Sequence, residues 1–256
     1  MIVCQYDEVF HAMTKIGFSF LMALAALPLA AQQTTVLAIG GHAGDMEVSA
    51  GAALARAARM GARVVLLHLT LGENGHPRKP AAEYARQKRE EAEAAAKALG
   101  GEARFGQWTD ASLRPGKETE EFVAGVIKDV KATHIITHWK NSIHRDHEAA
   151  YVIANHAALL AAVSGWKGVR SIVYAENWED PEGFQPYLYV DTTGDMDAWR
   201  KAVQCYEFLR GGVSAFPYLQ YYEGISMVRG AQARKRNATA FDIDAMGKRR
   251  VAEVWP

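Results

Sequence analysis

The sequence predicts a single α/β domain with a mostly parallel sheet and helices on both faces. Short apolar runs of strand length alternate with helical patterns between residues 36 and 175. The chain has 256 residues, 49% of them hydrophobic, which suits one α/β domain with a sizeable core. Its 29 basic and 29 acidic residues cancel, so no global field attracts a polyanion, and nucleic acid is not an expected partner.

The first segment, residues 1–31, is predicted to be a secretory signal peptide. An uncharged run over residues 16–31 follows Lys15 and ends in small residues. The run is shorter than the roughly 20 residues of a membrane span and contains Pro28, so we expect no stable span after cleavage. Two acidic residues near the N-terminus suit a signal peptide poorly, which makes Met13 an alternative start. The mature chain is expected to be secreted or periplasmic.

Strands and helices are then expected in alternation, separated by glycine-rich or polar turns. In order they are a strand at 36–39, a helix at 46–60, a strand at 64–69, a helix at 82–99, a helix at 118–130, a strand at 134–137, a helix at 147–163 and a strand at 171–175. Beyond residue 180 the pattern loosens, with one helix at 195–210, and we assign residues 32–230 to one domain. Residues 231–256 are polar and are expected to form a solvated tail.

Polar side chains that can bind a metal follow three of the predicted strands. His42 and Asp45 follow the first strand, Glu73 follows the second, and His144 and His147 lie beyond the strand that ends near residue 137. In an open parallel sheet, ligands bind outside the carboxyl ends of the strands, so these side chains should share one edge. Two histidines and a carboxylate with an open fourth position form a known catalytic zinc set, although other divalent ions suit the same ligands.

Other motifs are absent. The turn at residues 39–44 lacks the first glycine of the GxGxxG fingerprint, which argues against a nicotinamide cofactor, and the run at residues 144–148 matches none of the zinc-peptidase helix signatures.

The motifs resemble those of the PIG-L/LmbE family, the metal-dependent N-acetylglucosaminyl deacetylases and their relatives. The family's AHPDD motif corresponds to GHAGDME at residues 41–47, its TxGExG motif stands intact at residues 70–75, and its HPDH motif corresponds to HRDH at residues 144–147. Later landmarks at residues 190–202 and 221–225 extend the resemblance over most of the mature chain. The resemblance implies a Rossmann-like fold.

The resemblance also implies roles for individual residues. His42, Asp45 and His147 would be the metal ligands. His144 would protonate the leaving amine or steady the oxyanion, and Asp146 would hold His144 in orientation. The family's usual reaction removes acetate from an N-acetyl sugar by means of a water molecule that the metal activates.

One departure from the family concerns the general base. The first aspartate of the family's HPDD is replaced here by Gly44, which has no side chain to accept a proton. A positioned base contributes about 10² to 10⁴ in rate, so its loss would slow the reaction without abolishing it. Glu73 is the preferred substitute, although a role in capping backbone amides fits it equally well.

Two further residues are candidates for substrate binding. Arg89 lies, with Arg86 and Lys88, where the family often supplies a basic contact to the sugar, and Trp139 could stack on a sugar ring. A solvated helix face and plain packing are the competing interpretations.

The sequence therefore predicts a zinc-dependent deacetylase of a small amino sugar or glycoconjugate. The alternative is a carbohydrate-binding protein that retains its metal and has lost turnover at Gly44; a hydrolase of another amide or ester is a third possibility. The oligomeric state is left open.

Overall fold

The structure is a computed structural model that describes residues 33–179, 182–244 and 247–248. The described residues from Thr34 onward belong to one compact unit. The signal peptide predicted over residues 1–31 lies outside the described residues. Among the residues described, no helix combines the length and apolar character that crossing a membrane requires.

The described residues form a seven-stranded sheet in the order β3-β2-β1-β4-β5-β7-β6. The first five strands run parallel; they are β1 (Thr35–Gly40), β2 (Arg63–His68), β3 (Glu102–Phe105), β4 (His134–His138) and β5 (Ser171–Ala175). β7 (Ala238–Asp242) pairs antiparallel with both β5 and β6 (Leu188–Asp191). The predicted α/β class and mostly parallel sheet are confirmed.

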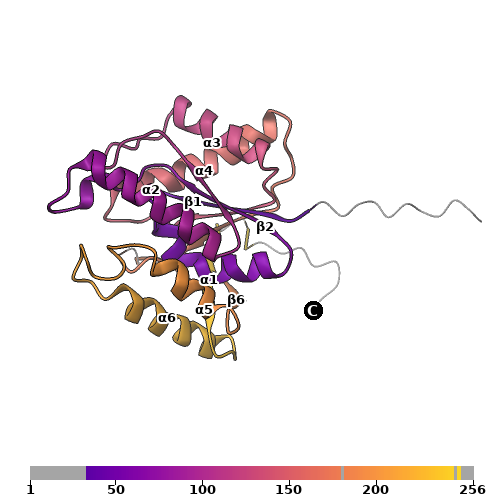
Figure 1. Ribbon diagram of the computed structural model, residues 1–256. Helices are drawn as coiled ribbons and strands as arrows, with labels where there is room; N and C mark the ends of the chain where they lie inside the picture. Colours follow the sequence, from indigo (N-terminus) through magenta and orange to yellow (C-terminus); the bar gives the residue numbers. More distant parts are fainter. Residues whose placement is uncertain (1–32, 180–181, 245–246, 249–256) are drawn as a thin grey trace, which may run out of the picture. The chain divides into compact units, whose positions relative to one another are not determined.

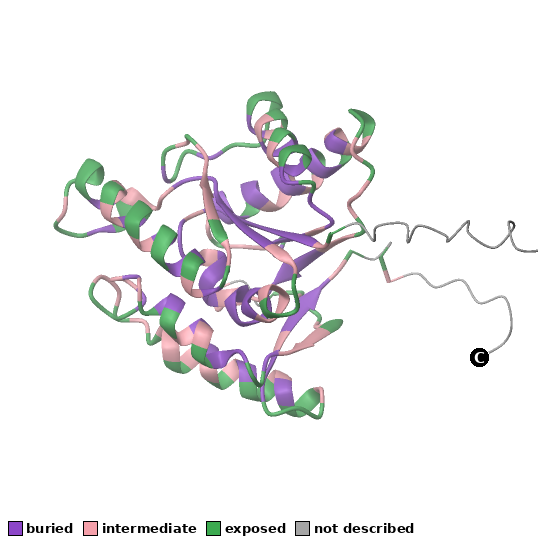
Figure 2. Ribbon diagram, turned by 45° about the vertical axis from the view of Figure 1, so that its right-hand side comes forward, coloured by how far each residue is buried: buried purple, intermediate pink, exposed green. Residues whose placement is uncertain are grey.

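Helices cover both faces of this sheet (Figure 1). One face carries α3 (Lys117–Asp129) and α4 (Arg145–Val163), and the other carries α1 (Asp45–Arg59), α2 (Ala81–Ala98), α5 (Met196–Val203) and α6 (Tyr218–Gln232). The buried central strands lie between these helical layers in Figure 2.

Alternating side chains of β1 build the two cores. Leu37 and Ile39 pack with α3 and α4, whereas Val36 and Ala38 pack in the core on the other face. Because successive side chains of a strand point to opposite faces, a strand buried on both sides is apolar throughout, as β1 is.

The C-terminal region differs from the sequence prediction. In place of a solvated tail beginning at residue 231, the chain adds β7 to the sheet, with Ala238, Ala240 and Phe241 buried. The strand is short and lies among charged residues, so the average polarity of the region hides it.

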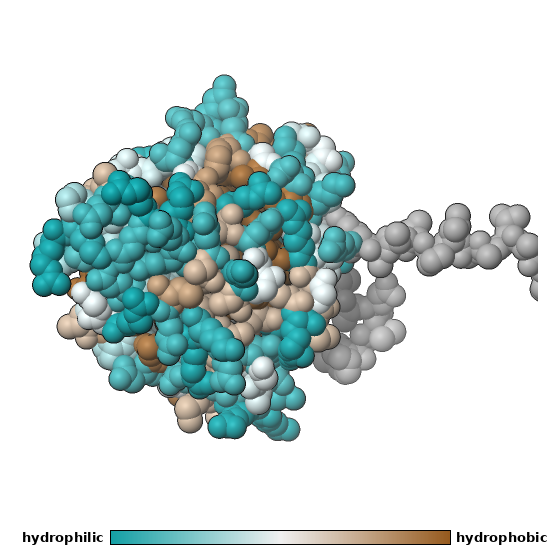
Figure 3. All heavy atoms as spheres, viewed as in Figure 1, coloured by the Kyte–Doolittle hydropathy of each residue, from teal (hydrophilic) through white to brown (hydrophobic). Residues whose placement is uncertain are grey.

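The face shown in Figure 3 is mostly hydrophilic, with small hydrophobic patches between the polar side chains.

The strand order reverses between β1 and β4. Strands β2 and β3 follow β1 on one side, while β4 and β5 lie on the other. In such a sheet the connections leave the carboxyl ends of the two central strands in opposite directions and open a crevice between them. The loops after β1 and β4 carry the candidate ligands to this place.

Candidate active site

Gly41 allows the loops after β1 and β4 to approach each other closely. Its backbone N–H donates to Nε2 of His138, 3.0 Å away at the end of β4. A Cβ atom at position 41 would lie 3.2 Å from the backbone oxygen of Asp146 and 3.2 Å from Cδ2 of His147. A glycine at this position therefore lets the first turn of α4 pack against the loop that carries His42.

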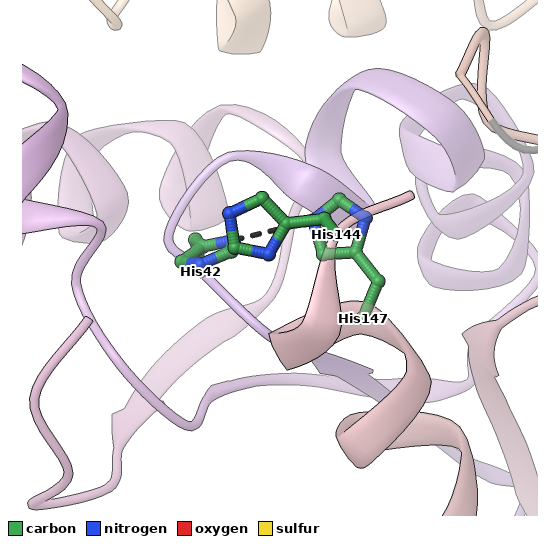
Figure 4. A group of neighbouring side chains, drawn as sticks. All are labelled: His42, His144 and His147. Carbon is green, nitrogen blue, oxygen red and sulfur yellow. Dashed lines mark hydrogen bonds between the residues drawn. The ribbon is translucent and has the colours of Figure 1, made fainter. Parts of the chain in front are cut away.

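The three predicted metal ligands point their donor atoms at one another. Nδ1 of His42 lies 3.2 Å from Nε2 of His147 and 3.2 Å from Oδ2 of Asp45. Nε2 of His147 lies 3.4 Å from the same Asp45 oxygen. Figure 4 shows the His42 and His147 rings converging, with His144 beside them.

These separations fit a tetrahedral metal ion. With bonds of about 2.0–2.1 Å, two ligands of a tetrahedral zinc ion are about 3.3 Å apart. Two neutral imidazoles and one carboxylate also provide the donor chemistry of a catalytic zinc site. His138 extends the cluster, because its Nε2 lies 3.1 Å from Oδ2 of Asp45 and its ring stacks on that of His147. The residues present therefore fit a divalent metal.

Carboxylates surround the outer nitrogen of His42. Its Nε2 lies 3.1 Å from Oδ1 of Asp110 and 3.4 Å from Oδ2 of Asp146. Burial alone would lower the pKa of His42, but Asp45, Asp110 and Asp146 together raise it well above its usual value. A carboxylate behind a ligand histidine fixes the orientation of its ring and increases its basicity toward a metal.

His147 is held from behind in a similar way. Its Nδ1 lies 3.4 Å from Oγ of Ser142 and 3.6 Å from Oε1 of Glu179. Both histidines thus turn one nitrogen toward Asp45 and the other toward groups that position the ring.

His144 stands next to this cluster at the N-terminus of α4. Its ring centre is 4.5 Å from that of His42 and 4.8 Å from that of His147. Nδ1 of His144 accepts a hydrogen bond from the backbone N–H of Asp146, so the neutral ring carries its proton on Nε2. Burial, together with His42 and His147, lowers the pKa of His144. In its neutral form the ring is a hydrogen-bond donor beside the ligand set.

Asp146 is placed differently from the role that the family resemblance implies. Its side chain accepts a hydrogen bond from the backbone N–H of Ala111, and the same oxygen faces His42. Only its backbone N–H contacts the His144 ring. Among the described residues the Asp146 carboxylate makes no hydrogen bond to His144, and it acts on the ring through its negative charge, which favours the protonated form. The carboxylate positions His42 and the loop at residue 111.

Glu73 holds the neighbouring loop in place. It lies in the short helix η1 (Glu73–Gly75), and its Oε1 accepts the backbone N–H of Asp110 at 3.0 Å. This is the amide-capping role that the sequence left open as the alternative to a general base. Asp110, held by this contact, is one of the two carboxylates that face Nε2 of His42.

The ligand set opens into a pocket of ≈ 260 Å³. Its wall includes the aromatic side chains of Tyr84, Trp178, Phe208 and Tyr218, together with Lys88. Trp139 and Arg89 are not among the described residues that line it. The Trp139 ring is buried against Tyr174 and Phe184, and the Arg89 guanidinium lies over Phe105. The structure thus places these two predicted substrate contacts in packing and on the helix surface.

Gly44, at the position of the family's general base, cannot accept a side chain without rearrangement. Its φ angle is 108°, and a Cβ atom there would lie 2.7 Å from Cζ of Phe208. A non-glycine residue would therefore be strained by its backbone and would also overlap the Phe208 ring. The place of the missing base is filled by an aromatic ring.

We predict that Gly44→Asp destabilises the protein by about 2–5 kcal/mol, the sum of a strained backbone and an overpacked contact. Urea unfolding of the wild type, Gly44→Asp and Gly44→Ala measures the effect, with Gly44→Ala testing the Cβ atom alone. Adding Phe208→Ala should restore part of the loss by removing the overlap. A Gly44→Asp variant as stable as the wild type would show that the site has room for the family's carboxylate.

Several residues of the site carry no recognisable signal in the sequence. Phe208 comes from the turn after α5, and Glu179 follows β5 without a motif. Lys88 lies in a run of charged residues on α2 that resembles a solvated face, yet its side chain is buried. Asp110 lies in a loop at the same edge of the sheet, and no motif in the sequence indicates its contact with His42.

An α/β domain with two histidines and an aspartate gathered at the switch point of its sheet defines a candidate metalloenzyme. Residues 37–158, just under half of the 256 residues, match the PIG-L family, described as GlcNAc-PI de-N-acetylase. The resemblance seen in the motifs is thereby confirmed. PIG-L enzymes depend on a metal, and the donor atoms of His42, Asp45 and His147 lie close enough together to hold one ion.

The relatives of known activity include deacetylases and a hydratase. A 4-oxalmesaconate hydratase of Pseudomonas putida is 29% identical over 218 residues, which cover 79% of this chain and 82% of that protein. The structure of GalB, the 4-carboxy-2-hydroxymuconate hydratase from Pseudomonas putida, has a TM-score of 0.77 and 24% identity, and covers 88% of this chain and 100% of that one.

N,N'-diacetylchitobiose deacetylase from Pyrococcus horikoshii has a TM-score of 0.71 and 18% identity, and covers 83% of this chain and 84% of that one. At these identities the structural matches establish the shared fold. They do not select a substrate.

Proposed function

We propose that the protein is a zinc-dependent N-deacetylase that removes the acetyl group from a small N-acetylated amino sugar or glycoconjugate. The observation that carries the proposal is the convergence of His42, Asp45 and His147 on one point, with separations of 3.2–3.4 Å between their donor atoms and with His144 alongside. The PIG-L family match and the diacetylchitobiose deacetylase neighbour support the reaction class.

Zinc bound by these three residues would polarise an amide carbonyl and lower the pKa of a water molecule. The chain itself supplies the remaining functions. The Nε2–H of neutral His144 would donate to the carbonyl oxygen as negative charge develops on it, and the protonated ring would donate to the departing amine. Asp110 and Glu179 keep the His42 and His147 rings in position.

The pocket suits a small ligand. Its volume of ≈ 260 Å³ is at or below the low end of ligand sites, which span about 300–1,000 Å³. Trp178 and Tyr218 give it an aromatic wall, and Phe216 stacks on Trp178 with ring centres 4.0 Å apart. A rigid aromatic wall offers an apolar face to one side of a sugar ring.

The test measures acetate released from N-acetylglucosamine derivatives by the zinc-loaded protein. We expect steady release that a chelator abolishes and added zinc restores, because all three ligands must hold the ion for the reaction. Sugar binding without acetate release would favour the binding protein that Gly44 suggested. Release that persists after complete removal of the metal would contradict the proposal.

A second candidate reaction is the addition of water to a conjugated double bond. Two observations favour it: the relative with 29% identity is a hydratase, and the Gly44–Phe208 contact removes the carboxylate that the family's deacetylases use as a base. Loss of ultraviolet absorbance from a conjugated unsaturated acid such as mesaconate, without acetate release from any amino sugar, would establish this candidate over the first.

A further inference from the structure

Lys88 places a buried ammonium group in the wall of the pocket. Its side chain is 3% exposed, and Nζ donates a hydrogen bond to the backbone oxygen of Ala43, in the loop that carries His42. The same nitrogen lies 4.0 Å from the ring centre of Phe208 and 4.7 Å from that of Tyr206. Two aromatic faces and one carbonyl thus surround the charge.

No carboxylate of the described residues forms an ion pair with Lys88. A carboxylate oxygen within 4.0 Å would make such a pair, and none of those described lies within this distance of Nζ. Burial lowers the pKa of Lys88 to about 8, so the group is still largely protonated at neutral pH. A buried charge without an ionic partner is costly, and contacts with aromatic rings offset only part of that cost.

The absence of a side chain at position 44 helps to leave Lys88 without an ionic partner. Nζ of Lys88 lies 3.7 Å from the place that a Cβ atom of residue 44 would occupy. A carboxylate on residue 44 would stand next to the ammonium and could neutralise it. Glycine at this position and the Phe208 ring beside it leave the positive charge facing the pocket.

The acidic residues of the pocket are engaged elsewhere. Asp45 and Asp110 lie against His42, and Glu179 lies against His147 and Asn177. Asp45, Glu91, Glu47 and Asp110 favour the charged form of Lys88 through longer-range attraction. None of them lies within ion-pair distance of Nζ, so the ammonium keeps N–H donors that no carboxylate of the described residues accepts.

We propose that Lys88 binds a carboxylate group of the substrate, which makes the substrate an acidic compound. The inference rests on the proposed function, which names an N-acetyl bond as the bond that is cleaved. It adds that the substrate carrying this bond is negatively charged. Lysine supplies up to three N–H donors, of which Ala43 takes one, so a substrate carboxylate can accept the others. Hydrogen bonds between charged groups are about twice as strong as neutral ones.

The experiment compares ligands that differ only in charge. Calorimetry on the zinc-loaded full chain measures the affinity for N-acetylglucosamine and for its uronic acid, in which a carboxylate replaces the hydroxymethyl group. A second pair consists of mesaconate, a dicarboxylate, and its uncharged dimethyl ester. We expect the acid of at least one pair to bind roughly 10- to 100-fold more tightly than its neutral partner.

Variants at position 88 assign the preference to the ammonium group. Lys88→Met should remove the preference, measured as the ratio of the affinity for the acid to that for its neutral partner, since methionine fills a buried apolar site without a charge. Lys88→Arg should retain at least part of the preference. Lys97→Met is the matched control, because Lys97 is exposed in the last turn of the same helix and should leave the preference unchanged. Thermal unfolding of each variant verifies that it folds.

Two results would overturn the inference: no preference for the acid in either pair, including no binding at all, or a preference that survives in Lys88→Met. Acetate release separates this outcome from the fate of the proposed function. Deacetylation of the neutral sugar without an acid preference would retain the function and remove the inference. Binding of the acid that depends on Lys88, without deacetylation, would retain the inference and contradict the proposed function.

Discussion

Replacing His147 by alanine is expected to remove bound zinc from the protein and to abolish acetate release. His147 supplies one of three donor atoms that lie 3.2–3.4 Å apart, and two donors alone hold a catalytic ion weakly. We expect less than about one tenth of the wild-type metal content after dialysis. Loss of a residue that only hydrogen-bonds to a ligand typically lowers metal affinity 10- to 100-fold, and loss of a ligand itself should lower it more. Metal analysis of the dialysed protein measures it directly.

His156→Ala is the matched control for this prediction. His156 lies on the same helix, α4, and its Nδ1 pairs with Glu120 on the exposed side, so the variant should keep its metal and its activity. Loss of metal from both variants would point to a general disturbance of α4. Full retention of metal in His147→Ala would remove His147 from the ligand set.

Replacing His144 is expected to lower turnover by about 10²- to 10³-fold while leaving the metal content unchanged. The ring lies 4.5 Å from that of His42 and presents its Nε2–H beside the ligand set, but its Nδ1 is occupied by the backbone N–H of Asp146. The loss of rate should therefore appear in kcat, because the donor acts mainly on charge that develops during the reaction.

His144 also caps α4, so two variants are needed to separate this role from the chemistry. His144→Asn retains a side-chain acceptor for the Asp146 N–H and should keep most of the stability, whereas His144→Ala should lose about 1 kcal/mol. Both should be equally slow if the ring acts on the substrate. Recovery of the rate in His144→Asn would show that the histidine serves only as a helix cap.

The meeting of His42, Asp45 and His147 could be predicted because their positions after two strands are local signals and the sheet topology brings the two loops together. Their assignment as metal ligands came from the family resemblance and stays a prediction. His42 and Asp45 lie three residues apart after β1, and His147 follows β4. Any parallel sheet with these two strands adjacent brings their carboxyl ends together. The predicted ligands needed no detail of side-chain packing to meet.

The surroundings of the ligands could not be predicted, because they depend on packing between distant segments. Lys88 belongs to a charged stretch of α2, and only the fold shows that it turns inward beneath Phe208. The placement of the Asp146 carboxylate depends on the first turn of α4, which begins at Arg145, and the sequence motif does not predict this placement. β7 was missed for a related reason, since five residues in a charged region give too short a pattern.

The central claim is that His42, Asp45 and His147 hold one divalent ion. Crystals of the zinc-loaded protein, measured on both sides of the zinc absorption edge, would locate the ion by its anomalous scattering. The account predicts a single strong peak about 2.0–2.3 Å from Nδ1 of His42, Oδ2 of Asp45 and Nε2 of His147. A peak bound instead by Asp110 and Asp146, or none at the three atoms despite stoichiometric zinc, would contradict it.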